Sequence, residues 1–122
     1  MTYEELVANA KEFYGNADAS AVTEHVAIQF NVTGEAQGAY YLEIKEGKAY
    51  VEPYEYFDRD LLVTADTDTL VAIASGKMGM EAAYLTGKLK AEGNLGKALL
   101  LKKLKHEKKA PAKKGILKKT KK

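Results

Sequence analysis

The chain has 122 residues, the usual size of one domain, and it contains no cysteine, which excludes disulfides, zinc–thiolate sites and cysteine nucleophiles. No apolar run approaches the roughly eighteen residues that a membrane span requires. The first part of the chain carries Glu4, Glu5 and Glu12 and no apolar run, so the sequence predicts no signal peptide and a cytoplasmic location.

The formal net charge of +2 hides an asymmetry between two parts of the chain. Residues 105–122 contain nine lysines and one acid, Glu107, for a net charge of +8, which leaves −6 for residues 1–104. The lysine-rich part also holds Pro111 and has little apolar content. We therefore predict an acidic folded domain over residues 1–104 and a disordered basic tail over residues 105–122.

The chain is expected to begin with an amphipathic helix over residues 2–14. Thr2 is a suitable N-cap, and Gly15 is a natural stop. The apolar residues recur at helical spacing and form one face: Leu6, Val7, Ala10, Phe13 and Tyr14. The segment 18–23 fits a short second helix capped by Asp18.

The pattern then changes to strict alternation, which is typical of strands with one buried face. Residues 25–33 and 39–45 alternate clearly, and Glu46-Gly47 predicts a tight hairpin turn to a third strand over residues 48–56. Pro53 marks an edge, an end or a bulge in that strand. A fourth strand over residues 60–65 completes a predicted antiparallel meander.

Helical spacing returns after the fourth strand. Asp66 or Thr67 caps a predicted helix that ends near Ser75, and residues 80–86 form a shorter helix. A fifth strand follows over residues 88–92, and Asn94 caps a last helix from Leu95 to about Leu104. The predicted fold is α+β, with a five-stranded, mainly antiparallel sheet and helices that cover one of its faces.

The sequence offers little for catalysis. His25 opens the first strand as an expected solvent-exposed side chain, and His106 falls in the predicted tail. No Gly-x-Ser-x-Gly elbow is present, and the acidic pairs at residues 58–60 and 66–68 suit a turn and a helix start. The segment Gly76–Gly79 lacks the spacing of a phosphate loop. We therefore expect no enzyme activity, no metal site and no cofactor.

Ligand binding is better supported than catalysis. Met78 and Met80 lie between two predicted helices beside the small residues Gly79, Ala82 and Ala83. Methionine adapts to irregular apolar shapes, including those of ligands, although ordinary core filling explains the same pattern. The last helix carries Leu99, Leu100 and Leu101 in succession, a wide apolar arc that suits a cavity cap, a partner contact or a deeply buried helix.

The segment ADTDTLVAIASGKMGMEAAYLTGKLKAEGNLGKALLLKKL, residues 65–104, resembles the C-terminal half of the sterol carrier protein 2 domain. The shared pattern comprises Gly76-Lys77, Ala82-Ala83, Gly87-Lys88-Leu89-Lys90, Gly93-Asn94 and Ala98-Leu99, in that order. The upstream strands fit the same domain, so the resemblance covers about residues 3–104. It implies an apolar tunnel between sheet and helices that accepts fatty acids, fatty acyl-CoA, phospholipids or sterols.

The resemblance also implies which residues face the tunnel. By position these are Met78, Met80, Ala83, Leu89 and Leu99; strand alternation adds Phe30 and Leu42, for which plain core is the alternative. The predicted function is non-catalytic lipid binding and transfer. The alternative is an accessory module that binds a partner protein of a lipid or isoprenoid-quinone pathway.

The lysine-rich tail has three interpretations: a solvated solubility segment, a transient tether of Lys105–Lys122 to anionic membranes, or nucleic-acid contact. It contains no arginine and no aromatic residue, which disfavours nucleic acid. The sequence ends in Thr120-Lys121-Lys122 and not in a Ser-Lys-Leu-type peroxisomal signal, which agrees with a cytoplasmic location. The oligomeric state is left open.

Overall fold

The computed structural model describes residues 1–106, so the predicted disorder of the lysine-rich tail concerns mostly residues outside the described part. The first helix, α1 (Tyr3–Gly15), begins at the predicted cap. The Thr2 hydroxyl accepts from the Glu5 amide at 3.1 Å, and the Glu5 carboxylate accepts from the Thr2 amide at 2.8 Å. This reciprocal capping box satisfies two backbone donors and fixes the start of the helix.

The short helix predicted over residues 18–23 does not form. The Asp18 carboxylate accepts from the Ser20 amide at 2.9 Å, which closes a local turn and not a helical cap. The preceding residues instead form the short strand β1 (Ala17–Asp18), which pairs with β7 (Lys105–His106). Pairing with a distant strand therefore takes up Asp18, the predicted cap, while residues 19–23 form neither helix nor strand.

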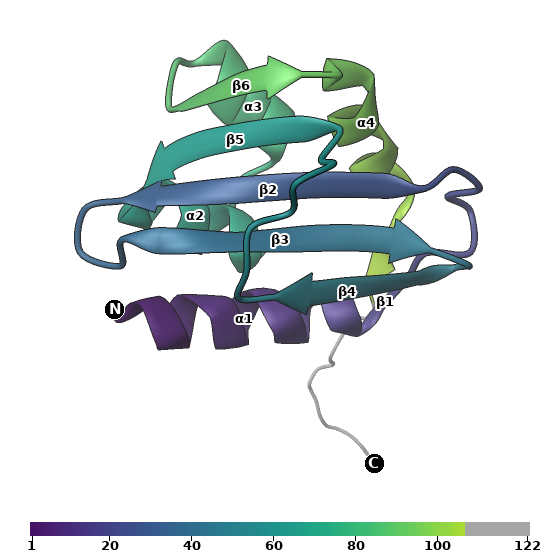
Figure 1. The fold of residues 1–122 in the computed structure, drawn as a ribbon, viewed down its shortest axis with the longest axis horizontal. Helices are drawn as coiled ribbons and strands as arrows, with labels where there is room; N and C mark the ends of the chain where they lie inside the picture. The colour runs from purple at the N-terminus through teal and green to yellow at the C-terminus, as the bar shows by residue number, and fades with distance from the viewer. Residues whose placement is uncertain (107–122) are drawn as a thin grey trace.

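The main sheet has five strands in the order β4-β3-β2-β5-β6 (Figure 1). Their bounds are β2 (Val26–Thr33), β3 (Gly38–Lys45), β4 (Lys48–Glu52), β5 (Leu61–Asp66) and β6 (Leu89–Gly93). The predicted hairpin is confirmed: Glu46 and Gly47 connect β3 to β4 with φ angles of 52° and 77°, the left-handed pair that suits a two-residue turn. Strand β4 lies at the sheet edge and ends immediately before Pro53, as that proline predicted.

The predicted four-strand meander is wrong at its last strand. Strand β5 does not pair with β4; it crosses over two strands and pairs in parallel with β2, so that Phe30 lies opposite Val63. The connection, residues 53–60, runs across the face of the sheet on which the described part of the chain places no helix (Figure 1). Short-range turn signals do not encode this long-range pairing, and the sheet is mixed, with three antiparallel pairings and one parallel pairing.

The later helices follow the predicted order with one change. Helix α2 (Thr67–Ala74) begins at Asp66, whose carboxylate accepts from the Thr69 amide at 2.8 Å, and α3 (Met80–Leu85) follows. The predicted last helix is divided into α4 (Leu95–Leu99) and a 3₁₀ turn, η1 (Leu100–Lys103). Lys105 and His106, which the sequence assigns to the tail, form strand β7 and pair with β1.

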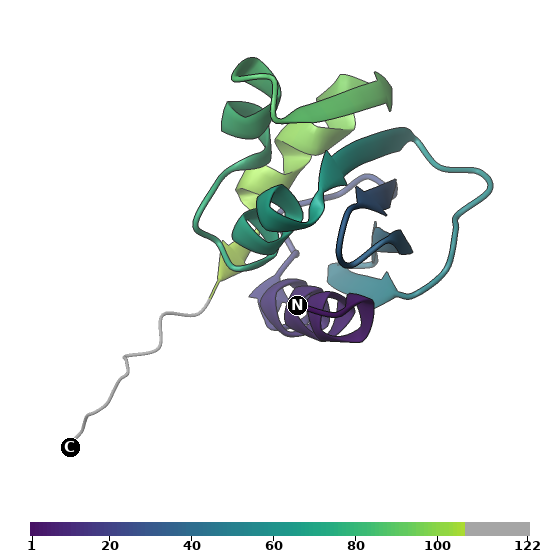
Figure 2. The same ribbon diagram turned by 90° about the vertical axis from the view of Figure 1, so that its left-hand side faces the viewer.

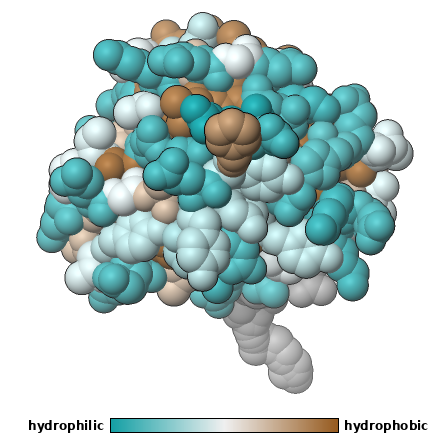
Figure 3. Space-filling model, in the orientation of Figure 1, coloured by the Kyte–Doolittle hydropathy of each residue, from teal (hydrophilic) through white to brown (hydrophobic). Residues whose placement is uncertain are grey.

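The helices within residues 1–106 all lie on one face of the sheet, as predicted (Figure 2). Alternate strand residues point into the layer between sheet and helices, including the fully buried Ile28, Phe30, Leu42 and Val63. The opposite face is largely hydrophilic (Figure 3). The fold therefore has a single apolar layer, and any apolar ligand must share that layer with the core.

Candidate functional site

An apolar cavity of about 590 Å³ lies between one half of the sheet and the helices that cover it. Strands β5 and β6 form one wall through Leu61, Val63, Leu89 and Ala91, which alternate along the strands and so share one face. The other walls come from α3, α4, η1, β7, the segment between α2 and α3, and the ends of α1 and α2. The lining residues there include Phe13, Tyr14, Ile73, Met78, Met80, Tyr84, Leu85, Leu95, Ala98, Leu99, Leu101 and His106.

The cavity opens to solvent on its helical side. Tyr84 and Leu85 of α3 are 43% and 73% exposed, and Leu95 and Leu99 of α4 are 42% and 50% exposed, although all four line the cavity. Exposed apolar side chains around an opening leave apolar surface in water until something covers it. This rim is the part of the site where an apolar ligand would gain most from burial.

Four of the seven predicted site residues line the cavity, namely Met78, Met80, Leu89 and Leu99. Phe30, Leu42 and Ala83 do not line it; each is fully buried in the core. The Phe30 ring stacks on the Tyr40 ring with centroids 4.9 Å apart, and Leu42 lies opposite Val51 in the half of the sheet nearer α1. The role of all seven residues in ligand binding remains a prediction, and so does the closed tunnel.

Phe13, Tyr14 and His106 also line the cavity, although no pattern in the sequence predicts this role for them. His106 was assigned to the tail, yet its ring stacks on Phe13 with centroids 4.0 Å apart, and its Nδ1 lies 3.2 Å from the Phe13 carbonyl oxygen. Phe13 and Tyr14 were assigned only to the apolar face of a helix. The one available signal was the pair of adjacent aromatic residues at the end of that face.

The charged residues of the lining neutralise each other. Glu81 of α3 and Lys102 of η1 form an ion pair at the cavity edge. The rest of the described lining is almost entirely apolar or small. Such a surface fits a hydrocarbon chain and gives no fixed charge in its interior to hold an ionic substrate.

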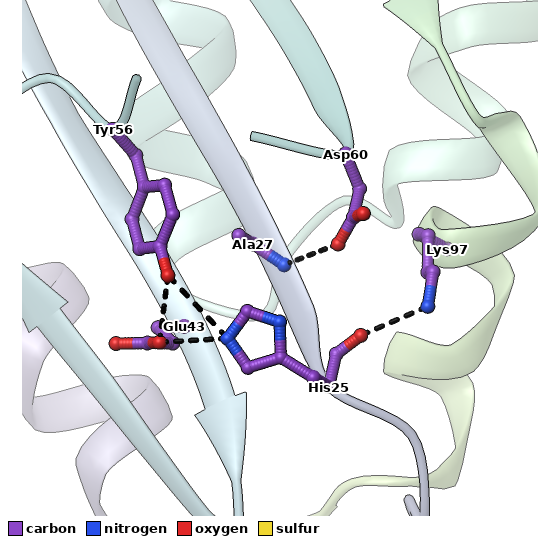
Figure 4. Close-up of polar contacts among 6 residues, drawn as sticks. All are labelled: His25, Ala27, Glu43, Tyr56, Asp60 and Lys97. Carbon is purple, nitrogen blue, oxygen red and sulfur yellow. Dashed lines mark hydrogen bonds and ion pairs between the residues drawn. The ribbon is translucent and has the colours of Figure 1, made fainter. Parts of the chain in front are cut away.

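A polar cluster lies on the opposite, helix-free face of the sheet (Figure 4). His25 Nε2 lies 2.7 Å from the Glu43 carboxylate, and the Tyr56 hydroxyl donates to the same carboxylate oxygen at 2.9 Å. Tyr56 belongs to the crossover connection between β4 and β5. Asp60 of the same connection accepts a hydrogen bond from the Ala27 amide at 2.9 Å. These contacts fasten the connection to the sheet, which explains its path without a catalytic role.

The ionisation of this cluster follows from its contacts. Partial burial raises the pKa of Glu43, but hydrogen bonds from His25 and Tyr56 outweigh this effect and leave the pKa below its ordinary value. Burial, followed by the hydrogen bond to Glu43 and its charge, raises the pKa of Tyr56 to about 12. The stable state near neutral pH therefore has an ionised Glu43 and a protonated Tyr56.

Replacing Glu43 with glutamine should lower the free energy of unfolding by about 1 kcal/mol at pH 7, because the hydrogen bonds lose their charged acceptor. A group with a lowered pKa stabilises the fold above its unfolded pKa, and this contribution is lost as the pH falls through the folded pKa. The difference between the proteins should therefore vanish in acid. Urea unfolding at pH 7 and pH 3 tests this, with the exposed Glu55→Gln as control; a difference that persists in acid would contradict it.

Within residues 1–106 no three His, Asp or Glu side chains gather as a group that could ligate a metal. None of the helices in this range combines the length and apolar character needed to traverse a bilayer.

Comparison with known proteins agrees with this architecture. The model of the SCP-2 sterol transfer family matches residues 7–106. Hydroxysteroid dehydrogenase-like protein 2 of Xenopus tropicalis is 33% identical over 90 residues, which are 73% of this chain and 21% of that protein. The chain thus spans about a fifth of the length of the curated relatives that it matches.

Solved structures share the fold. The palmitated SCP2L2 of Aedes aegypti has a TM-score of 0.62 at 18% identity and covers 88% of this chain and 100% of that one. The UbiJ-SCP2 ubiquinone synthesis protein has a TM-score of 0.59 at 15% identity and covers 81% of this chain and 88% of that one. The family match over most of the chain confirms the resemblance seen in the sequence, and the protein belongs to the SCP-2 sterol transfer family.

Proposed function

We propose that the protein binds and transfers a lipid, such as a fatty acid, a fatty acyl-CoA, a phospholipid or a sterol-like molecule, without changing it chemically. The observation that carries this proposal is the apolar cavity of about 590 Å³, a volume within the range of small-molecule sites. The palmitated state of the Aedes aegypti SCP2L2 supports an acyl chain as the guest of this fold.

A non-catalytic role agrees with the separation of the polar and apolar features. The His25, Glu43 and Tyr56 cluster lies on the outer face of the sheet (Figure 4), whereas the cavity lies between the sheet and the helices, so a lipid in the cavity would not meet the cluster. The charged lining residues Glu81 and Lys102 are engaged with each other. Lipid binding therefore explains the placement of these polar and charged groups better than a catalytic reaction does.

Native mass spectrometry of protein purified without detergent tests the proposal. We expect a discrete mass adduct that disappears on denaturation, and extraction should identify it as a lipid. Incubation of stripped protein with palmitate or palmitoyl-CoA should restore an adduct of the corresponding mass. A clean apo mass that none of these lipids changes would overturn the proposal.

The exposed rim favours a second candidate, an accessory module that holds a partner protein. Leu85 and Leu99 are at least half exposed, and a partner could cover them as readily as a lipid headgroup region. The UbiJ-SCP2 neighbour, a ubiquinone synthesis protein, supports this alternative at the level of fold. The two candidates differ in one measurement: Ala91→Trp, which fills the cavity from the sheet, should abolish a lipid adduct, while capture of a partner by the exposed rim should survive it.

A further inference from the structure

Two tyrosine hydroxyls are buried in the apolar layer without a hydrogen-bond partner among residues 1–106. Tyr14 of α1 is 4% exposed and Tyr40 of β3 is 1% exposed, and neither hydroxyl makes a hydrogen bond in the described part of the chain. By contrast, the Tyr3 hydroxyl donates to the Ala39 carbonyl and the Tyr56 hydroxyl to Glu43. A buried hydroxyl without a partner costs free energy, so each one calls for an explanation.

Position distinguishes the two hydroxyl-bearing residues. Tyr14 lines the cavity, whereas Tyr40 lies outside it in the core against Phe30. Tyr14 comes from the end of α1, and α1 and α3 lie at opposite ends of the helical layer (Figure 2). Tyr14 therefore marks the α1 end of the cavity, away from the exposed leucine of α3 at the rim.

The surroundings of Tyr14 indicate which ligand group it would accept. Burial alone raises the pKa of Tyr14, so its hydroxyl is neutral and can both donate and accept a hydrogen bond. The same burial would penalise an ionised carboxylate, and the lining cation, Lys102, is paired with Glu81. His106 at this end is exposed and stacked on Phe13. The α1 end of the cavity therefore suits an oxygen atom without charge.

We propose that the Tyr14 hydroxyl is the hydrogen-bond partner of an uncharged hydroxyl or carbonyl oxygen of the bound lipid, whose hydrocarbon part extends towards α3 and α4. This inference rests on the proposed lipid-binding function and makes it more specific. Tyr14 selects for a lipid with a neutral oxygen at the α1 end of the cavity, where its hydroxyl has no hydrogen-bond partner among residues 1–106.

The substitution Tyr14→Phe removes only the hydroxyl. We expect it to weaken the binding of 1-dodecanol about five- to tenfold, the value of one buried hydrogen bond, and to leave 1-chlorododecane within about twofold. The melting temperature of the free protein should rise, because an unpaired buried hydroxyl is lost. Displacement of a fluorescent naphthalene dye, whose own Kd is measured for each variant, gives the affinities.

Tyr40→Phe is the matched control. It should raise the melting temperature in the same way and leave both affinities unchanged, because Tyr40 does not line the cavity. Equal affinities of Tyr14→Phe and the wild type for 1-dodecanol would overturn the inference, as would a lowered melting temperature of free Tyr14→Phe. If the wild type binds neither probe, the proposed function itself fails, which is a separate outcome.

Discussion

Replacing Ala91 with tryptophan should reduce the affinity for a long-chain lipid by roughly fiftyfold while the protein stays folded. Ala91 lies on β6, and its side chain faces the cavity from the sheet. An indole ring there would occupy the space of several methylene groups of the ligand. Each methylene that is kept out of the cavity forfeits about 0.8 kcal/mol, so exclusion of three corresponds to about 2.4 kcal/mol, or roughly fiftyfold in Kd.

Lys90→Trp is the control for this substitution. Lys90 precedes Ala91 on the same strand, is exposed and points to the opposite face, so the same ring should leave lipid affinity unchanged there. Titration of each variant with a fluorescent fatty acid, together with circular dichroism to verify the fold, gives the comparison. Equal affinities of Ala91→Trp and Lys90→Trp would show that the lipid binds elsewhere.

The second large effect is expected at Gly93, where β6 ends beside the start of β5. Gly93 has a φ of +119°, and a Cβ atom there would lie 2.5 Å from the Asp60 carbonyl oxygen and 3.2 Å from the Leu61 Cα. Both neighbours are backbone atoms, and the Asp60 carbonyl also accepts from the Asn94 amide at 2.8 Å. Gly93→Ala should therefore lower the free energy of unfolding by at least about 2 kcal/mol.

In a domain of this size, that loss lowers the melting temperature by roughly 10 °C. Gly15→Ala provides the control, because nothing lies within 4 Å of the Cβ position at the end of α1 and its φ is not positive. Alanine there should be neutral or stabilise by a few tenths of a kcal/mol. Thermal unfolding followed by circular dichroism measures both variants, and equal melting temperatures would rule out strain at Gly93.

The sequence predicted features that depend on neighbouring residues. Thr2, Asp66 and Asn94 cap their helices as expected, since a cap is a contact between residues two or three positions apart. The hairpin at Glu46-Gly47 is of the same kind. Such contacts depend on a few consecutive residues, so the sequence alone is enough to predict them.

Features that depend on distant residues were missed or wrong. The parallel pairing of β2 with β5 joins segments more than thirty residues apart, and no turn signal specifies it. Asp18, the predicted cap of a helix over residues 18–23, lies instead in β1, which needs Lys105 and His106 as partners. Both errors arise because long-range pairing overrides a weak local preference.

The candidate site residues also divide into those that local sequence predicts and those that depend on the long-range fold. Met78 and Met80 were found because unbranched apolar residues between small ones are visible in the sequence. Phe30 was placed correctly on the inner face of the sheet, but alternation cannot say which strands the cavity touches. The cavity borders β5 and β6, whereas Phe30 on β2 meets packed core.

The helices that form the opening are weakly anchored compared with the rest of the fold. Helix α3 contributes one buried residue, Ala83, and α4 and η1 contribute none, whereas α1 contributes four. Free energy for local opening scales with such buried contacts, so amide hydrogens of α3 and α4 should exchange with solvent far faster than those of β2 and β5. Under the proposed function, a lipid would enter and leave by transient fraying of α3 and α4, while the sheet keeps its protection.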